Sequence, residues 1–239
     1  MRKIIILLFV SVFFMVSSNF DYEERKKIIL IDPGHGGFDG GAVSKRKTIE
    51  KEMNLKIALK LKDKLIEKYD VVMTREEDVA LHDEGTIKHK KLQDLNKRRK
   101  MIDETHCDLF ISIHLNQFNS PNVKGCQAYY ADNENSKIFA EILNENFGSI
   151  TGGKKRAPKV NEKFIILKDI KEVPSVIFEG GFLSNAEEDK MLNTDEYQTK
   201  LAEVIEKSID DYFDRPKIIE NNTTLEQNDI NSTIDINEN

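Results

Sequence analysis

The sequence predicts a single α/β domain built on a mostly parallel sheet with helices on both faces. Short, continuous apolar runs, typical of strands buried on both faces, alternate along the chain with stretches of helical periodicity. This alternation indicates a parallel sheet, because each parallel connection needs a crossover segment. The length of 239 residues fits one domain with short terminal additions better than two full domains.

Continuous apolar runs predict the core strands. They are Ile28 to Ile31, Val71 to Met73, Leu109 to Ile113 and Val176 to Phe178. Two further segments are interpreted as additional strands toward an edge of the sheet, namely Gln127 to Tyr130 and Lys163 to Leu167.

The segments between these strands carry the periodicity of amphipathic helices. In the first, an apolar residue recurs every four positions at Met53, Ile57, Leu61 and Leu65, which predicts a helix with one buried stripe. Further helices are predicted over Leu92 to Ile102, Ser136 to Phe147 and Asp195 to Phe213. Because ligands bind outside the carboxyl ends of parallel strands, functional residues are expected directly after the predicted strands.

The first residues have the pattern of an export signal. Arg2 and Lys3 precede an apolar run from Ile4 to Val16, which is shorter than the ~20 residues of a transmembrane helix and ends at small polar residues. Residues 1–18 are therefore expected to be a signal peptide or an N-terminal anchor, and residues 19–26 a linker. The protein is accordingly expected to act outside the cytoplasm.

The C-terminal residues and the overall composition limit the extent of the functional domain and the kinds of partner it can bind. Residues 217–239 are rich in Asn and acidic residues without an apolar stripe, so a disordered tail is expected there, which leaves residues 27–216 as the functional domain. The net charge of −6 gives little attraction to phosphate backbones and argues against a nucleic-acid partner. The two cysteines, Cys107 and Cys126, form at most one bridge and are interpreted as small, partly buried residues.

A glycine-rich segment with one imidazole, His35, directly follows the first predicted strand. Five of the 12 glycines of the chain fall within residues 34–41, so the backbone must turn sharply here or approach another group closely. The spacing matches neither of the common phosphate-binding loops. Taken alone, the segment is as consistent with a tight turn and an incidental histidine as with a ligand.

A second histidine, His114, ends the third predicted core strand. One histidine in such a place is often a hydrogen-bonded core residue. Two histidines, each at the carboxyl end of a predicted core strand, are expected to converge on one site.

Two carboxylates complete the set of candidate residues. Glu50 opens the first predicted helix, with Thr48 as the expected N-cap, and so lies near the same sheet edge as His35. For Glu50 alone, favourable electrostatics at a helix N-terminus is the simpler interpretation. Glu179 follows an apolar run and precedes two glycines, so burial is expected to raise its pKa; a structural ion pair is the alternative.

Two imidazoles and one carboxylate are a common ligand set for catalytic zinc, which leaves the fourth position for water. A second carboxylate can then serve as a general base, and this arrangement suits hydrolysis of an amide or ester. The long spacings between His35, Glu50 and His114 exclude a local H-E-x-x-H motif. On the residues alone, a zinc hydrolase site is therefore one hypothesis beside the structural interpretations.

The combination of these motifs resembles a known family. The segments that carry the resemblance are Asp32–Gly37, Glu50–Leu55, Thr74–Arg75, Ser112–Asn116 and Pro174–Asn185. In this order they resemble the zinc-dependent N-acetylmuramoyl-L-alanine amidases of the type 3 family, over roughly Lys27 to Phe213. The resemblance implies a six-stranded sheet, one zinc ion per chain with His35, Glu50 and His114 as ligands, and Glu179 as the catalytic carboxylate.

Within that family the chain is similar to the germination-specific amidases of spore-forming bacteria. The similarity rests on Thr74–Asp78, the basic stretch Lys88–Arg98, and Ser120–Pro121. It implies that the enzyme acts on the glycan strands and peptide stems of peptidoglycan, so that muramic-δ-lactam forms in the spore cortex. It also implies a secreted or membrane-anchored enzyme in the space around the developing spore.

The implied mechanism assigns the proton transfers to Glu179. Zinc would polarise the lactyl carbonyl of N-acetylmuramic acid, while Glu179 deprotonates the attacking water and passes the proton to the amine of L-alanine. Asn116 is expected to orient the substrate or a ligand. Because the chain shows no wall-binding repeats, a separate protein is expected to localise or activate it. A zinc peptidase or deacetylase, or a catalytically silent peptidoglycan-binding module, remain the alternatives.

Overall fold

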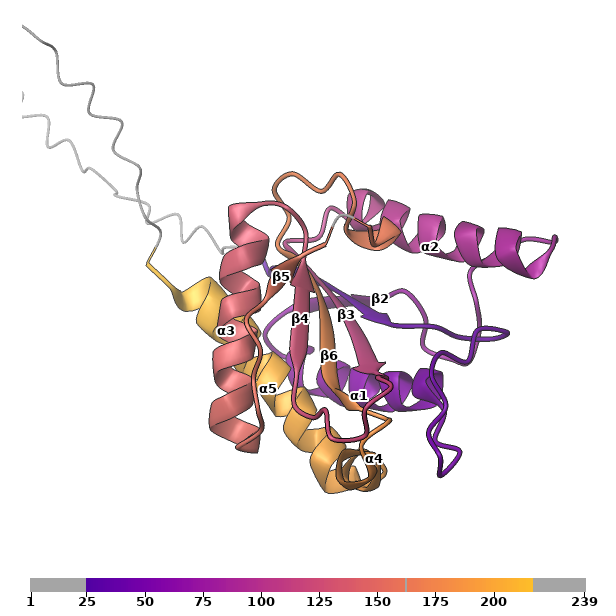
Figure 1. Ribbon diagram of the computed structural model, residues 1–239. Coiled ribbons are helices and arrows are strands. Elements are labelled where there is room, and N and C mark those ends of the chain that lie inside the picture. The colour runs from indigo at the N-terminus through magenta and orange to yellow at the C-terminus, as the bar shows by residue number, and fades with distance from the viewer. Residues whose placement is uncertain (1–24, 162, 217–239) are drawn as a thin grey trace, which may run out of the picture.

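A six-stranded sheet runs through the middle of the molecule (Figure 1); the structure is a computed structural model that describes residues 25–161 and 163–216. The strands follow the order β2-β1-β3-β6-β4-β5 across the sheet. Their bounds are β1 (Ile28–Pro33), β2 (Asp70–Met73), β3 (Leu109–Asn116), β4 (Gln127–Tyr130), β5 (Lys159–Val160) and β6 (Ser175–Phe182). All neighbouring pairs are parallel except β4 and β6, which confirms the predicted mostly parallel sheet.

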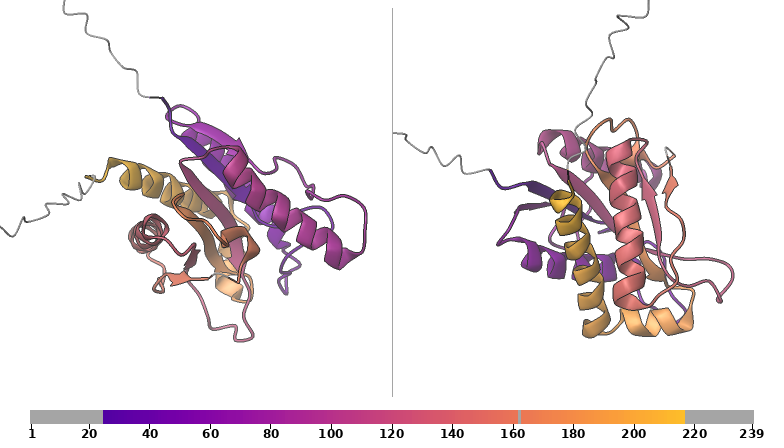
Figure 2. Two further views of the ribbon diagram at one scale, coloured as in Figure 1. Left: turned by 90° about the horizontal axis from the view of Figure 1, so that it is seen from above. Right: turned by 90° about the vertical axis from the view of Figure 1, so that its left-hand side faces the viewer.

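Helices cover both faces of this sheet, as predicted. Their bounds are α1 (Glu50–Leu65), α2 (Ile87–Glu104), α3 (Glu134–Thr151), α4 (Ala186–Leu192) and α5 (Asp195–Asp214), with a short 3-10 helix η1 (Ile165–Leu167). Helices α1, α3 and α5 pack on one face, and α3 and α5 lie side by side in Figure 2. Helix α2 and η1 contact each other and cover the opposite face.

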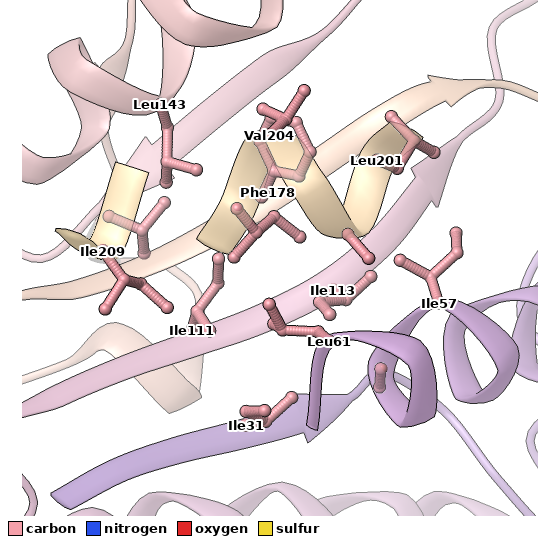
Figure 3. Close-up of a cluster of buried hydrophobic side chains, with 14 of the residues drawn as sticks. Ile31, Ile57, Leu61, Ile111, Ile113, Leu143, Phe178, Leu201, Val204 and Ile209 are labelled. Atoms are coloured by element: carbon pink, nitrogen blue, oxygen red, sulfur yellow. The ribbon is translucent and has the colours of Figure 1, made fainter. Parts of the chain in front are cut away.

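The two faces arise from the alternation of side chains along the central strands. In β3, Ile111 and Ile113 point to the larger cluster, where they meet Leu61 of α1 and Val204 of α5 (Figure 3). Phe110 points the other way, to the smaller cluster beneath α2 and η1. Each fully buried apolar side chain of this kind stabilises the fold by roughly 1.5–3 kcal/mol, so both clusters contribute to the stability of the central strands.

The predicted strand over Lys163 to Leu167 is wrong. The edge strand β5 comes earlier, at Lys159–Val160, and the apolar run itself forms η1. One turn of helix buries Ile166 and Leu167 together in the cluster beneath α2. A short apolar run cannot be distinguished from a buried helical turn by periodicity, because both place consecutive apolar residues in the core.

Two smaller differences concern burial and the ends of the chain. The run at Val71 to Met73 is a strand, but β2 lies at the sheet edge and only Met73 in it is buried.

The predicted export segment and the predicted tail, residues 1–18 and 217–239, lie outside the described residues. Within the described part, no helix has the length and apolar character needed to cross a membrane.

The two cysteines are unpaired thiols and are more fully buried than the sequence suggested, which left open whether they form a bridge. Cys107 and Cys126 are both free, at 4% and 0% exposure. Burial raises the pKa of the Cys107 thiol to about 11 and that of the Cys126 thiol to about 12. Both side chains therefore act as small apolar residues of the two core clusters.

Candidate metal centre

Three side chains from separate elements meet at the carboxyl edge of the sheet. His35 follows β1, Glu50 is the first residue of α1, and His114 lies near the end of β3. One ligand atom from each lies within 4.8 Å of the others. Nε2 of His35 is 3.2 Å, and Nδ1 of His114 3.0 Å, from the same oxygen, Oε1 of Glu50. The residues singled out in the sequence thus converge on one point.

These spacings fit a tetrahedral metal ion. Zinc binds histidine nitrogen and carboxylate oxygen at about 2.0–2.2 Å, so two such ligands at a tetrahedral angle lie about 3.3 Å apart. The two separations from Glu50, 3.2 and 3.0 Å, are close to this value. The imidazole rings of His35 and His114 meet edge to face, with centroids 4.9 Å apart, rather than stacking. The donor set and its spacing therefore suit one zinc ion.

The glycine-rich segment is explained by close approach of its backbone to these side chains. A Cβ at residue 34 would overlap the imidazole ring of His114, so only Gly34 leaves room for the ring. Gly41 adopts a φ of +69°, and a Cβ there would lie 2.5 Å from Oε2 of Glu50. The segment therefore both turns sharply and passes close to the candidate side chains of His114 and Glu50.

His35 is oriented by a carboxylate behind it. Oδ2 of Asp39 lies 2.9 Å from Nδ1 of His35 and also 2.9 Å from the ammonium group of Lys91. A hydrogen bond donated by Nδ1 leaves Nε2 free to bind a metal. Burial lowers the pKa of His35, but the hydrogen bonds to Asp39 and Glu50 outweigh it and raise the pKa to about 9 in the metal-free chain. The carboxylates of Asp39 and Glu50 therefore favour positive charge at this ring.

Glu50 is held in place by backbone amides. The amide of Ala42 donates to its Oε2 at 2.7 Å, and the amide of Leu115 donates to its Oε1 at 3.2 Å. Burial raises the pKa of Glu50, but the hydrogen bonds to the two histidines dominate and keep the pKa below its usual range. Glu50 is thus an ionised, preoriented carboxylate.

The predicted N-cap of this helix is wrong. Helix α1 begins after Ile49, which forms no side-chain cap. The hydroxyl of Thr48 accepts a hydrogen bond from the side chain of Asn193 instead, and its backbone pairs with Ser44 in the preceding turn. The bridge between Val43 and Ile49 closes that turn, so tertiary contacts decide the entry to the helix.

Glu179 lies within β6, directly opposite His114 of β3 in the sheet register. Its Oε2 is buried and has no hydrogen-bond partner among the described residues. Burial raises the pKa of Glu179 to about 7; the nearby His114 opposes this effect and Glu50 reinforces it. A carboxyl group with a pKa near neutral pH can both accept and return a proton, which is the property that a general base and acid needs.

A cavity of about 360 Å³ opens onto the three ligand residues and Glu179. Its walls come from α2 on one side and from residues 163–166 on the other, with Leu95 and Phe164 as apolar members. Asn116 also lines the cavity, at the end of β3. Its orienting role stays a prediction. The segment predicted as an edge strand therefore forms a wall of the site.

The sequence interpretation assigned no role to several residues that support the site. Asp39 and Lys91 form the chain of contacts behind His35. Asn54 donates its side-chain amide to the carbonyl of Gly34 at 3.2 Å, and its Oδ1 has no partner among the described residues. The four-residue spacing from His35 to Asp39 is a local signal for the first contact, whereas Lys91 lies too far along the chain for any pattern to link it.

The chain is similar to known proteins over nearly the whole of its folded part. The family model described as N-acetylmuramoyl-L-alanine amidase matches residues 29–211. The germination-specific N-acetylmuramoyl-L-alanine amidase of Bacillus subtilis (strain 168) is 38% identical to this chain over 192 residues, which is 78% of this chain and 80% of the relative.

Solved structures show the same similarity. The CwlD amidase from Clostridioides difficile, solved in complex with the GerS lipoprotein, has a TM-score of 0.75 and 36% identity; the match covers 79% of this chain and 98% of that one. An N-acetylmuramoyl-L-alanine amidase from Clostridium difficile 630 has a TM-score of 0.70 and 30% identity, with 79% and 97% coverage.

Proposed function

Because this chain belongs to the N-acetylmuramoyl-L-alanine amidase family, we propose that it hydrolyses the amide between N-acetylmuramic acid and L-alanine with one zinc ion. The observation that carries the zinc assignment is the convergence of His35, Glu50 and His114 within 4.8 Å beside a buried carboxyl group. The chemistry of the three residues and the two separations from Oε1 of Glu50, 3.2 and 3.0 Å, support zinc as the metal.

Zinc bound by these residues would supply a Lewis acid that polarises a carbonyl and makes water acidic near neutral pH. Neighbouring residues of the chain orient the side chains of His35 and Glu50 before the substrate binds. Asp39 fixes the ring of His35 through Nδ1, and the amides of Ala42 and Leu115 fix the carboxylate of Glu50. Little reorganisation is then needed at the moment of reaction.

Glu179 is proposed as the group that moves the proton. Its buried Oε2 lies beside the ligand residues, and its pKa of about 7 allows it to take a proton from water at neutral pH. The protonated carboxyl group can then donate the same proton to the departing amine of L-alanine. The cavity between α2 and residues 163–166 offers a place for the substrate, and Asn116 in its wall is proposed to orient it.

The products of digestion test the reaction. Purified peptidoglycan incubated with the full chain and zinc is expected to release complete peptide stems with a free L-alanine amine, measured by mass spectrometry. Shortened stems would indicate a peptidase, deacetylated sugars a deacetylase, and no product a binding module. A chelator is expected to abolish release and added zinc to restore it; release that persists in the metal-free chain would contradict the zinc assignment.

The biological role is proposed to be formation of the spore cortex. The similarity to the germination-specific amidase of Bacillus subtilis supports this role. Removing stems would expose the muramic acid residues that become muramic-δ-lactam. The predicted export segment, residues 1–18, is in keeping with action outside the cytoplasm.

Loss of the gene from a spore-forming host is expected to give spores whose cortex contains no muramic-δ-lactam, measured by mass spectrometry of digested cortex. The lactam requires a muramic acid freed of its stem. The unaltered gene should restore it, and a Glu179→Gln copy should not. Normal lactam content in the deletion strain would contradict the cortex role without affecting the proposed reaction.

A separate protein partner is also proposed. The CwlD amidase of Clostridioides difficile was solved in complex with the GerS lipoprotein, which supports a partner of this kind for a related chain. A partner of this kind could confine the activity of this chain to the developing spore.

A further inference from the structure

Arg75 is a buried guanidinium whose hydrogen bonds all go to backbone carbonyls. The side chain is 3% exposed and forms no ion pair within the described part of the chain. Nε donates to the carbonyls of Pro33 and His35 at 2.9 and 2.8 Å. Nη2 donates to the carbonyl of Gly34 at 3.1 Å. Three consecutive carbonyls of the loop that carries His35 are therefore held by one side chain.

The same guanidinium also reaches the helix that carries Glu50. Nη2 donates to the carbonyl of Lys51 at 2.9 Å, one residue after Glu50 in the first turn of α1. Arg75 thus links the two segments that supply His35 and Glu50, whose ligand atoms lie 3.2 Å apart. A planar guanidinium with five donors in a rigid fork can bridge two segments in this way, whereas an ammonium group acts as a single point.

The backbone around His35 is shaped for this contact. His35 itself adopts a left-handed φ of +62°, which a residue with a side chain rarely adopts without support from its surroundings. A Cβ at Gly36 would lie 2.2 Å from the carbonyl oxygen of Val79 and 2.9 Å from Nε of Arg75, so the glycine leaves room for both. The turn at His35 thus places the His35 carbonyl and the open side of Gly36 against the Arg75 guanidinium.

A second buried arginine, Arg98, contacts the same loop in a different manner. It donates to the carbonyls of Pro33 and His35, but it also forms ion pairs with Asp32 and Asp94. Its charge is therefore balanced within the fold. Arg98 and Asn54 also donate to the loop carbonyls, and Asn54 lies on α1, so the loop keeps partners and a contact with α1 when Arg75 is replaced. What is lost is the bridge from these carbonyls to the carbonyl of Lys51, directly after Glu50.

We infer that Arg75 is a positioning residue for the metal centre, which sets the distance between His35 and Glu50 by binding the carbonyls of both segments. This inference rests on the proposed zinc site. It assigns a role to Arg75 of the Thr74-Arg75 motif, a residue that the proposed proton transfers do not use.

The test is zinc affinity of the full, metal-free chain, measured by competition with a chromophoric chelator. Arg75→Lys retains the charge and is expected to weaken zinc binding by about 10- to 100-fold, as loss of a group that supports a metal ligand typically does. Arg75→Ala should be weakened at least as much and should recover part of its affinity when ethylguanidinium is added, because that cation can occupy the vacated space.

Leu143→Ala is the matched control, since Leu143 is fully buried in α3 and does not line the cavity of the site. It should lower the melting temperature while zinc affinity stays within about twofold, a change that is small against the 10- to 100-fold loss expected at Arg75.

Folded Arg75 variants with unaltered zinc affinity would overturn the inference, as would Arg75 variants that do not fold at all. If the unaltered chain binds no zinc, the proposed metal site fails and this inference with it; if it binds zinc and Arg75→Lys binds equally well, this inference alone fails.

Discussion

Glu179→Gln is expected to lower turnover by about 10²- to 10⁴-fold while leaving zinc affinity unchanged, because the variant keeps the shape of the side chain but cannot accept a proton. The three proposed ligand residues do not include Glu179, so their contacts with Ala42, Leu115 and Asp39 persist. Release of stems from peptidoglycan and a chelator competition measure the two properties on the same sample.

The same substitution has a pH-dependent effect on stability in the metal-free chain. The native pKa of Glu179, about 7, lies above the ordinary glutamate value of 4.5, so the native state is penalised when the group ionises. Stability of the parent therefore falls, relative to Glu179→Gln, as the pH rises from about 4.5 to 7, by roughly 3 kcal/mol in total. Urea unfolding at pH 5 and pH 8 measures the difference.

Glu172→Gln provides a control for these measurements. Glu172 precedes β6 and is exposed, and its backbone carbonyl accepts a hydrogen bond from the side chain of Asn135. The control should match the parent in turnover and in the pH dependence of stability. Full turnover in purified Glu179→Gln protein would remove Glu179 from the mechanism.

Arg98→Met is expected to destabilise the chain by about 3–5 kcal/mol, since it leaves two buried carboxylates without their cation. Arg98 is 1% exposed and contacts Oδ1 of Asp32 at 2.6 Å and Oδ2 of Asp94 at 2.8 Å. Burial raises the pKa of Asp32, but Arg98 and the hydroxyls of Ser112 and Thr74 together lower it below its usual range. Removing Arg98 deletes the largest of these favourable interactions.

Urea unfolding at pH 7 measures the loss of stability, and two further variants show whether the uncompensated buried charges cause it. Asp32→Asn combined with Arg98→Met should recover part of the stability, because one uncompensated charge is gone. Lys62→Met removes a cation from a surface pair with Glu76 and should cost less than about 1 kcal/mol. Equal effects of Arg98→Met and Lys62→Met would show that the buried pair contributes no more than a surface pair.

The local hydrophobic pattern was sufficient to predict the elements that contain a continuous apolar run or a regular apolar stripe. The runs around Leu30, Ile111 and Ile177 are buried in the central strands, and the four-residue stripe that contains Ile57 and Leu61 faces the core from α1. Polar residues at the ends of such runs stand out against the apolar pattern, which is why the sequence alone makes His114 and Glu179 candidates.

Tertiary contacts determined the features that depend on residues far apart in the chain. The run at 163–167 became a helical turn because α2 offered a surface for Ile166 and Leu167. The seven-residue helix α4 was not predicted, being too short to show a periodic stripe.

By itself, the sequence determined the α/β architecture, its central strands and the four polar residues proposed for chemistry. The tertiary structure alone decided which nitrogen of each histidine faces Glu50, how Arg75 and Arg98 hold the loop at His35, and which wall encloses the cavity. The physical reason is the separation along the sequence of the residues involved. Hydrophobic periodicity among neighbouring residues indicates which of them are buried. Hydrogen bonds, ion pairs and cavity walls instead join groups that are far apart in the sequence, and only folding brings them within a few ångströms.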